Sequence, residues 1–407
     1  MSETTSIAAS QARPRLKFID MARSFAILLM LEGHFTGAAL ADQYRSSEYW
    51  LYNVWHNLHG LTSPLFFTVT GLIFVYLLSA NNEINYLDNI RVKKGYRRVR
   101  ELLFWGYLIQ FNLWSVAKSL YHGSKFYMEW FYAFHVLQSI GVGIFFLLVI
   151  YGIYKWINKG SLHWYYFIFA LIILILYAWV KNYMQVDAQL VAEGLRDQPA
   201  YIPQNAPSII QNMIYGKYSD FSIVRYSGYV LLGGMLGALI RKYEEKTREW
   251  WFGVAFIVIC LVINIFIQPM LHYLDKLIEA TGLVSDSVLE LCTTSLRRFG
   301  QVMGVLGTLM LIDKYFTVRS GLFLKIGQTT LPIYVVHVII LYGGIFGFGL
   351  KPLVFDQNLH PLEAAAVSLF FMLVFSIMVK YIEPLERVYG AAKSKLTFWI
   401  PKEKASH

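Results

Sequence analysis

The residues best suited to chemistry lie together in one hydrophobic stretch, DMARSFAILLMLEGH, at positions 20–34. Asp20 and Arg23 stand at its beginning, and Glu32 and His34 lie near its end. Ionisable side chains are costly near the middle of a bilayer, so within an apolar segment they indicate function more often than packing.

The spacing of Arg23 and His34 places both on one face of a helix. The rotation between them is about 20° beyond three full turns, and they are about 16 Å apart along the axis. Asp20 can pair with Arg23, one turn later. Glu32 points well away from His34 and is expected to face a neighbouring helix. The alternative interpretation is an interfacial Asp20–Arg23 pair with His34 as an ordinary polar contact between helices.

Composition places the chain among membrane proteins. Of its 407 residues, 56% are hydrophobic and 15% are charged, which is outside the range of soluble domains. The net charge of +10 follows membrane topology, so it does not indicate nucleic-acid binding. The two cysteines, Cys260 and Cys292, form neither a disulfide framework nor a zinc pattern, and no metal site is expected.

We expect an all-α polytopic membrane protein with ten spans, because ten apolar stretches approach the length of about 20 residues that a bilayer requires. They fall near 18–38, 61–80, 101–118, 132–154, 164–183, 222–240, 250–271, 299–312, 327–349 and 362–382. With both termini in the cytosol, 24 of the 36 Lys and Arg residues lie in cytosolic segments.

The predicted organisation has three parts. A cytosolic tail, 1–17, precedes a transmembrane domain, 18–382, and a basic cytosolic tail, 383–407, follows it. Within the domain, residues 184–221 form an ordered cap on the extracytoplasmic side, because proline, asparagine and glutamine interrupt the apolar pattern there.

Further polar residues cluster toward the extracytoplasmic half of the predicted spans. They are His56 and His59 before the second span, His135 and Gln138 in the fourth, Arg225 in the sixth, Arg297 and Arg298 in the eighth, and Tyr334 and His337 in the ninth. Arginines at helix ends commonly extend to the interface, which is the simpler explanation for Arg297 and Arg298. His337 and Arg225 are deeper.

The cytosolic side carries a basic run from Arg91 to Arg98 that would meet lipid phosphates or an anionic ligand. Metalloprotease, α/β-hydrolase and P-loop motifs are absent from the sequence.

These motifs resemble the transmembrane acyltransferase superfamily, which includes acyltransferase-three sugar O-acyltransferases and heparan-α-glucosaminide N-acetyltransferase-like proteins. The resemblance covers about residues 15–385. It rests on Asp20-Met-Ala-Arg23 followed by His34, and on PLFFTVTG, RRVRELLFWGYLI, HVLQSIG, YSGYVLLGGMLGALI and IGQTTLPIYVVH in that order. The chain departs from the family pattern at Ser24, where glycine is usual, in HNLHGLT, which leaves the choice between His56 and His59 open, and at Arg225-Tyr226, where Pro-Trp is usual.

The resemblance implies transfer of an acyl group, most simply acetyl, from cytosolic acyl-CoA to a carbohydrate or lipid-linked acceptor at the extracytoplasmic face. His34 would be the general base or the site of a transient acyl-histidine. Arg23, Asp20, Arg97 and Arg98 would bind the donor. His56, His59, His135, Gln138, Arg225, Arg298, Tyr334 and His337 would support the acceptor or the transition state. A bacterial inner membrane is the implied location, and a homo-oligomer remains open.

A secondary transporter or a lipid-linked sugar flippase is the alternative, since transporters also place ionisable residues at mid-membrane. The sequence lacks the internal repeat and the paired Gly/Pro-broken helices that are typical of transporters. A purely structural protein would not need four ionisable groups in one helix.

Overall fold

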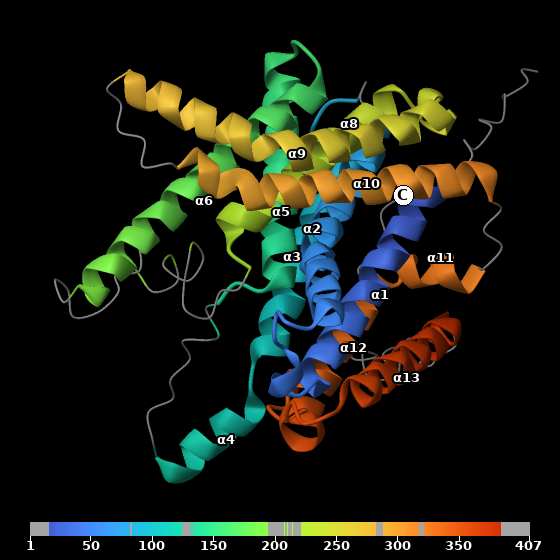
Figure 1. Ribbon diagram of the computed structural model, residues 1–407. Helices are drawn as coiled ribbons and strands as arrows, with labels where there is room; N and C mark the ends of the chain where they lie inside the picture. Colours follow the sequence, from blue (N-terminus) through green and yellow to red (C-terminus); the bar gives the residue numbers. More distant parts are fainter. Residues whose placement is uncertain are drawn as a thin grey trace, which may run out of the picture.

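Long apolar helices make up the protein in the computed structural model (Figure 1). The structure describes residues 16–81, 84–123, 133–193, 221–281, 288–316 and 321–383, and the single positions Phe131, Pro207, Ile210 and Ile214. Among these residues there is no β-strand, and the one β-type contact is an isolated bridge between Leu40 and Leu359.

The structure describes twelve α-helices. They are α1 (Lys17–Ala39), α2 (Trp50–Leu78), α3 (Ile90–Gln110), α4 (Leu113–His122), α5 (Val136–Ile157), α6 (Leu162–Ala192), α8 (Ile223–Lys242), α9 (Trp250–Ala280), α10 (Thr293–Tyr315), α11 (Gly321–Gln328), α12 (Thr330–Tyr342) and α13 (Pro361–Lys380).

Six described helices, α2, α5, α6, α8, α9 and α13, are long and apolar enough to cross a membrane, and the bent pair α11–α12 adds a seventh if it counts as one span. α1, α3 and α10 have 23, 21 and 23 residues, which is also sufficient length, but polar side chains interrupt them. The prediction of an all-helical polytopic membrane protein is confirmed. The count of ten spans and the cytosolic termini stay predictions.

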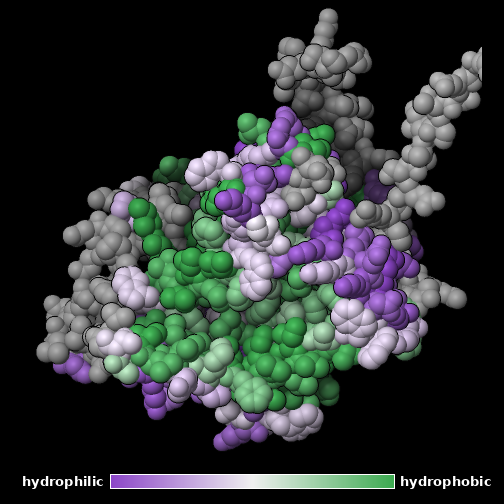
Figure 2. Space-filling view, turned by 90° about the horizontal axis from the view of Figure 1, so that it is seen from above, coloured by the Kyte–Doolittle hydropathy of each residue, from purple (hydrophilic) through white to green (hydrophobic). Residues whose placement is uncertain are grey.

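The outer helices expose apolar side chains that a bilayer would cover. In the most apolar window of α8, 72% of the residues are buried, whereas the value for α9 and α13 is 22%. On α9, Val258, Leu261 and Ile265 are each at least half exposed. Figure 2 shows hydrophobic residues gathered over much of one face of the molecule. Exposed surface of this extent indicates contact with lipid.

Glycines bring the backbones of α2 and α8 into contact. A Cβ on Gly233 would lie 1.9 Å from the carbonyl oxygen of Thr68, and one on Gly71 would lie 2.0 Å from that of Val230. Small residues allow this close approach between membrane helices. The central helix α8 therefore fixes the position of α2, which carries His56 and His59.

Ser24, at the position where the resembled family pattern has glycine, ties α1 to α11. Its hydroxyl lies 2.5 Å from the carbonyl oxygen of Phe323 and 2.9 Å from that of Asp20, and it accepts a hydrogen bond from the N–H of Gly327 at 2.9 Å. Ser24 is fully buried, so these bonds have no competition from solvent.

The third predicted span, 101–118, is wrong. α3 begins at Ile90, because Asn89 caps it by accepting a hydrogen bond from the N–H of Arg91 at 2.8 Å. The chain then breaks at Asn112, whose side chain caps α4 through the N–H of Ser115 at 2.9 Å. The basic run thus lies on the first turns of a helix and not in a loop.

The ninth predicted span, 327–349, is broken. α11 and α12 meet at Thr329 with a bend of 76°. Pro332 has no N–H to donate to the carbonyl of Gln328, and its ring would clash with that carbonyl in a continuous helix. α12 therefore begins a new direction at Thr330.

Two helices begin earlier than the sequence pattern predicts. α2 begins at Trp50, so His56 and His59 lie within the helix and not before it. α10 begins at Thr293, which places Arg298 more than one turn inside. The cap predicted at 184–221 and both predicted tails lie largely outside the described residues.

The topology can be tested with reporter fusions. Because positive charge concentrates on one side of the predicted bundle, fusions at Lys159 and Lys246 should report the cytosol, and a fusion at Gln204 should report the opposite side. Paired alkaline phosphatase and fluorescent protein fusions measure this. A cytosolic signal at Gln204 would contradict the ten-span arrangement.

Candidate active site

His34 lies in a group of aromatic rings from three helices. Its ring centroid is 5.2 Å from that of His337, 6.2 Å from that of His59 and 5.7 Å from that of Tyr342. Its Nδ1 is 2.7 Å from the hydroxyl oxygen of Tyr342. We call these four residues the histidine cluster. α1, α2 and α12, which supply them, converge at the lower end of the view in Figure 1.

His337 is fully buried, and its two ring nitrogens have different roles. Nδ1 lies 3.3 Å from the carbonyl oxygen of Ile333. A carbonyl can only accept, so Nδ1 carries the hydrogen, and in a neutral ring Nε2 holds the lone pair. That buried Nε2 has no hydrogen-bond partner among the described residues. An unpaired buried nitrogen beside a second imidazole is a candidate for proton transfer.

His59 is held against α1 through a chain of contacts that ends at Glu32. The ring of His59 stacks on Trp55 at 5.4 Å with an interplanar angle of 2°. The indole N–H of Trp55 donates to Glu32 Oε1 at 2.9 Å, and the hydroxyl of Thr36 donates to the same oxygen at 2.9 Å. The expectation that Glu32 faces a neighbouring helix is confirmed.

The structure brings His59, and not His56, to His34. His56 is exposed and stacks on Tyr52 at 5.7 Å, one turn away from the cluster. Residues four apart share a helix face, so Trp55 orients His59 while Tyr52 pairs with His56.

A cavity of about 170 Å³ lies near the other end of α1. Arg23, Arg98, Thr330 and Tyr334 line it, together with apolar residues of α2, α3 and α5. Arg23 donates to the hydroxyl of Thr330 at 3.4 Å, and Arg98 forms an ion pair with Glu101 at 2.8 Å. Two arginines at an otherwise apolar cavity suit an anionic ligand with an apolar part.

We call this space the inner cavity. Two other residues of the predicted donor site, Asp20 and Arg97, are neighbours in sequence of residues that line it. The side chain of Asp20 is buried on the same turn of α1 as Arg23. Arg97 is exposed on α3, beside Arg98.

Tyr334 separates the inner cavity from the histidine cluster. It lines the cavity, and its ring centroid is 5.0 Å from that of His337. His34 is not among the residues that line the cavity, so in this conformation the cavity does not reach His34.

Four predicted support residues lie outside the ring contacts of His34. Gln138 is buried and donates to Gln110 at 2.5 Å. Arg225 lies 5.5 Å from the ring centres of both Tyr177 and Tyr226. His135 precedes the first turn of α5. Arg298 donates to the carbonyl of Asn57 at 2.8 Å and so contacts α2 near His59.

The sequence pattern did not indicate Tyr342 or Lys351. Tyr342 is the last residue of α12, and Gly343, with φ 88°, caps the end of the helix. The Lys351 ammonium lies 5.8 Å from the ring centre of Tyr342. The segment between α12 and α13 is tied to the end of α1 by the N–H groups of Ala41 and Leu359, which donate to the carbonyls of Leu359 and Ala39. The one available signal was the Gly343-Gly344 pair, which predicts a helix end directly after a tyrosine.

Within the described ranges, no group of three or more His, Cys, Asp or Glu residues is arranged to hold a metal ion. The geometry therefore offers a histidine cluster and an arginine-lined cavity as its candidate functional groups.

A family model described as an acyltransferase domain matches residues 16–381. The match includes all residues of the histidine cluster and of the inner cavity. No curated protein matches the chain.

Gly33 allows His59 to reach His34, and this can be tested by stability. A Cβ on Gly33 would lie 1.9 Å from Nδ1 of His59, whereas one on Gly37, a turn later, would have only Trp55 at 4.0 Å. We expect Gly33→Ala to destabilise the protein by about 1–3 kcal/mol through overpacking. Gly37→Ala should be neutral or stabilising, because alanine favours helices.

The measurement is thermal unfolding of the purified protein in detergent. His59→Ala in the Gly33→Ala background should restore most of the lost stability, since it removes the clashing ring. Equal effects of Gly33→Ala and Gly37→Ala would show that His59 does not occupy this position.

Proposed function

The chain belongs to the acyltransferase-three family and is a membrane acyltransferase, and we propose that its histidine cluster transfers an acyl group from cytosolic acyl-CoA to an acceptor on the other side of the membrane. The observation that carries the proposal is the position of His34, the member of the cluster that α1 supplies, on the same helix as Arg23 and about three turns away. One helix thus presents an anion-binding cation and a titratable base to the interior of the bundle. We further propose acetyl as the acyl group, a carbohydrate or glycolipid-type acceptor, and a bacterial inner membrane as the location.

Arg23 and Arg98 hold the donor. Both line the inner cavity, and a guanidinium can bind phosphate oxygens in bidentate fashion. Asp20, one turn before Arg23, balances its charge. The exposed Arg97 adds a positive charge on the cytosolic side of the inner cavity. The cavity is narrow and mostly apolar beyond the arginines, which suits the pantetheine arm and acyl chain better than the nucleotide.

His34 acts as the general base. It removes the proton from the acceptor hydroxyl or amine, whose oxygen or nitrogen attacks the thioester carbonyl carbon. The carbon–sulfur bond breaks, and the proton passes from His34 to the leaving thiolate, so the ring returns to its neutral state. A transient acyl-histidine would use the same ring as nucleophile.

Tyr342 and His337 position and support His34. When Nδ1 of His34 donates to the Tyr342 oxygen, its Nε2 holds the lone pair that the reaction needs. The free Nε2 of His337 lies in a ring directly beside His34. The inner cavity does not reach His34, and Tyr334, which lines it, contacts His337. The acyl group therefore reaches His34 only after these side chains move.

Family membership favours this enzyme over the transporter and flippase alternatives. Radiolabelled acetyl-CoA tests the proposal directly, because neither alternative incorporates the acyl group into a product.

His34→Ala should reduce acyl transfer in membranes by at least about 100-fold, the usual range for loss of a general base. Acyl-CoA binding should persist, because His34 lies outside the inner cavity. His56→Ala is the matched control, and it should retain near-normal rates because His56 is exposed and lies outside the histidine cluster. A His34→Ala protein with normal transfer would leave His337 as the next candidate base.

The same proposal gives the direction of the pH dependence. A base must be neutral, so the rate of the intact protein should fall as the pH drops through the pKa of His34. The groups that face His34 are His59, His337 and Tyr342, with Lys351 beside Tyr342. A rate that rises on acidification would contradict a neutral His34 as the base.

Arg23→Ala should raise the KM for acyl-CoA by at least about tenfold, because it removes a cation from the inner cavity. Arg23→Lys should recover little of this loss, since an ammonium cannot replace the planar guanidinium at a bidentate contact. Initial rates at varied acyl-CoA concentrations give both values. An unchanged KM in Arg23→Ala would make the arginine structural.

A further inference from the structure

A second cavity is lined by Trp55, whose ring also stacks on that of His59. It has a volume of about 330 Å³ and is enclosed by α1, the short 3₁₀ turn Asp42–Tyr44, and the beginnings of α2 and α13. Four of its lining residues are aromatic, namely Tyr44, Tyr49, Tyr52 and Trp55. We call it the aromatic pocket. It shares no lining residue with the inner cavity, so the two are separate sites.

The mouth of the aromatic pocket faces apolar surface. Leu51, which lines it, is 64% exposed, and Ala365 on α13 is also exposed. The neighbouring Leu362 is 77% exposed. Since α13 presents most of its apolar residues to the outside, the exposed residues beside the pocket suit contact with lipid better than contact with water.

Glu32 supplies a charged hydrogen-bond acceptor inside this pocket. Its Oε1 accepts from Thr36 and Trp55. Its Oε2 has no donor among the residues that the structure describes. A carboxylate oxygen can accept more than one hydrogen bond, so Glu32 can receive a hydroxyl or amine of a bound molecule.

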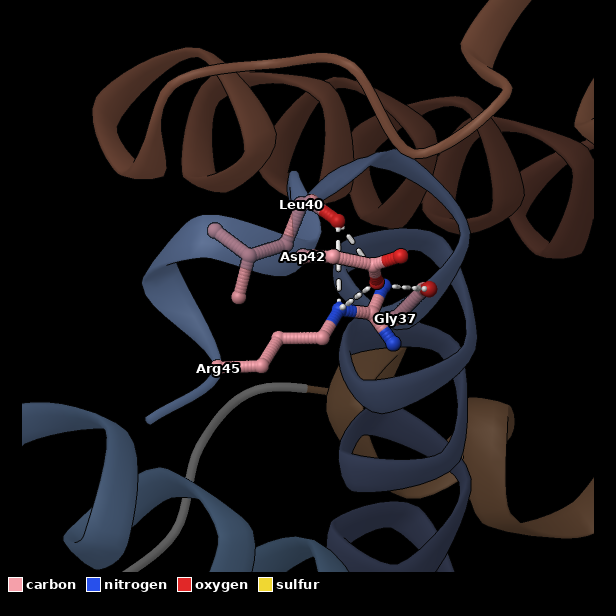
Figure 3. A network of polar contacts seen from close by, with 4 residues as sticks. All are labelled: Gly37, Leu40, Asp42 and Arg45. Atoms are coloured by element: carbon pink, nitrogen blue, oxygen red, sulfur yellow. Dashed lines mark hydrogen bonds and ion pairs between the residues drawn. The ribbon is translucent and has the colours of Figure 1, made fainter. Parts of the chain in front are cut away.

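Arg45 holds the turn that carries Tyr44 against the end of α1, and Figure 3 shows its contacts with Gly37, Leu40 and Asp42. Its guanidinium donates to the carbonyls of Gly37 at 2.7 Å and Leu40 at 2.8 Å, and it pairs with Asp42 at 3.3 Å. These carbonyls belong to the last turn of α1 and to the residue that follows it, where no helical partner remains for them. The pocket is thus preformed, as ligand sites usually are.

We infer, on the basis of the proposed function, that the aromatic pocket binds the acceptor, and that the acceptor is an amphiphile with a hydrocarbon tail. Its hydroxylated head group binds at Glu32 and Trp55, and its tail stays in the bilayer beyond Leu51 and Ala365. A water-soluble sugar would have to leave water to pass this apolar mouth, which costs free energy that a lipid-anchored molecule does not lose.

Trp55 connects this site to the chemistry. Its ring lines the aromatic pocket and stacks on His59, whose own ring faces His34. The rings of Trp55 and His59 separate a head group at Glu32 from His34, so the acceptor reaches the base from the side of α2 only when these rings move. The donor arrives from the inner cavity past Tyr334.

The first test fills the pocket. Ala365→Trp places an indole in it, and Ala366→Trp, the matched control, places the same side chain on an exposed α13 position that does not line the pocket. Membranes of the organism that carries the gene receive radiolabelled acetyl-CoA, and the product is partitioned between organic solvent and water. We expect His34-dependent label in the organic phase, a loss of about tenfold or more in Ala365→Trp, and normal values in Ala366→Trp, with the KM for acetyl-CoA unchanged in both.

The outcomes separate the two proposals. Label that depends on His34 but enters water-soluble material, with Ala365→Trp fully active, would overturn the lipid-anchored acceptor and leave the proposed function intact. Absence of His34-dependent label from both phases would overturn the proposed function together with this inference.

A second test measures binding without turnover. A dodecyl glycoside with a brominated chain should quench the fluorescence that Trp55 contributes, taken as the difference between the normal protein and Trp55→Phe in lipid nanodiscs. The quenching should vanish in Ala365→Trp and persist in Ala366→Trp. Equal quenching by brominated phosphatidylcholine would identify the pocket as an ordinary lipid site and overturn the inference.

Discussion

The hydrogen bonds of the Ser24 hydroxyl set the position of α1 against α11, and the rest of the site depends on that register. With Ser24 bound to Phe323 and Gly327, the neighbouring Arg23 reaches Thr330. Eleven residues later, His34 reaches His337. A shift of α1 by one residue would rotate its side chains by about 100° and separate both pairs. A buried serine therefore determines which polar groups meet inside the bundle.

The break between α11 and α12 is the second requirement. A straight helix through Thr329 could not follow both the course of α11 across α1 and the course of α12 alongside it. Pro332 lowers the free-energy cost of the break, because it has no N–H and cannot donate a hydrogen bond to the carbonyl of Gln328 in any case. Irregular backbone inside a membrane is tolerated where protein surrounds it, and here Ser24 satisfies the Phe323 carbonyl and the Gly327 N–H near the break. α12 then carries Thr330, Tyr334 and His337 past Arg23 and His34 in order.

The sequence predicted the parts of the site that depend on helical periodicity. The shared face of Arg23 and His34 and the depth of His337 follow from spacing and apolar context alone. The choice between His56 and His59 could not be predicted from spacing, because it depends on Gly33 leaving room for a ring that comes from another helix.

Tyr342 and Lys351 lie at a helix end and in a connecting segment, where position is set by contacts with α1 and not by local pattern. Arg225 was predicted from its depth and Gln138 from its place at the start of the fourth span, but Gln138 donates to Gln110, and Arg225 lies against tyrosines of α6 and α8. The start of α3 was missed for a local reason, since the capping role of Asn89 outweighed the basic residues after it.

Beyond Lys17 at its first position, α1 carries four ionisable residues that form two pairs, and under the proposed function this pairing explains why a membrane helix retains so much charge. Arg23 lines the inner cavity, and His34 lies in the histidine cluster. Asp20 lies buried beside Arg23, and Glu32 holds Trp55, so each carboxylate supports the region of one functional residue. A buried cation without a nearby acid, or a histidine whose neighbours could drift, would be far less suited to its role in a medium that solvates neither. Glu32 also lines the aromatic pocket, and through Trp55 its carboxylate helps to position His59. A molecule that binds Glu32 in the pocket would therefore alter the position of the His59 ring beside His34.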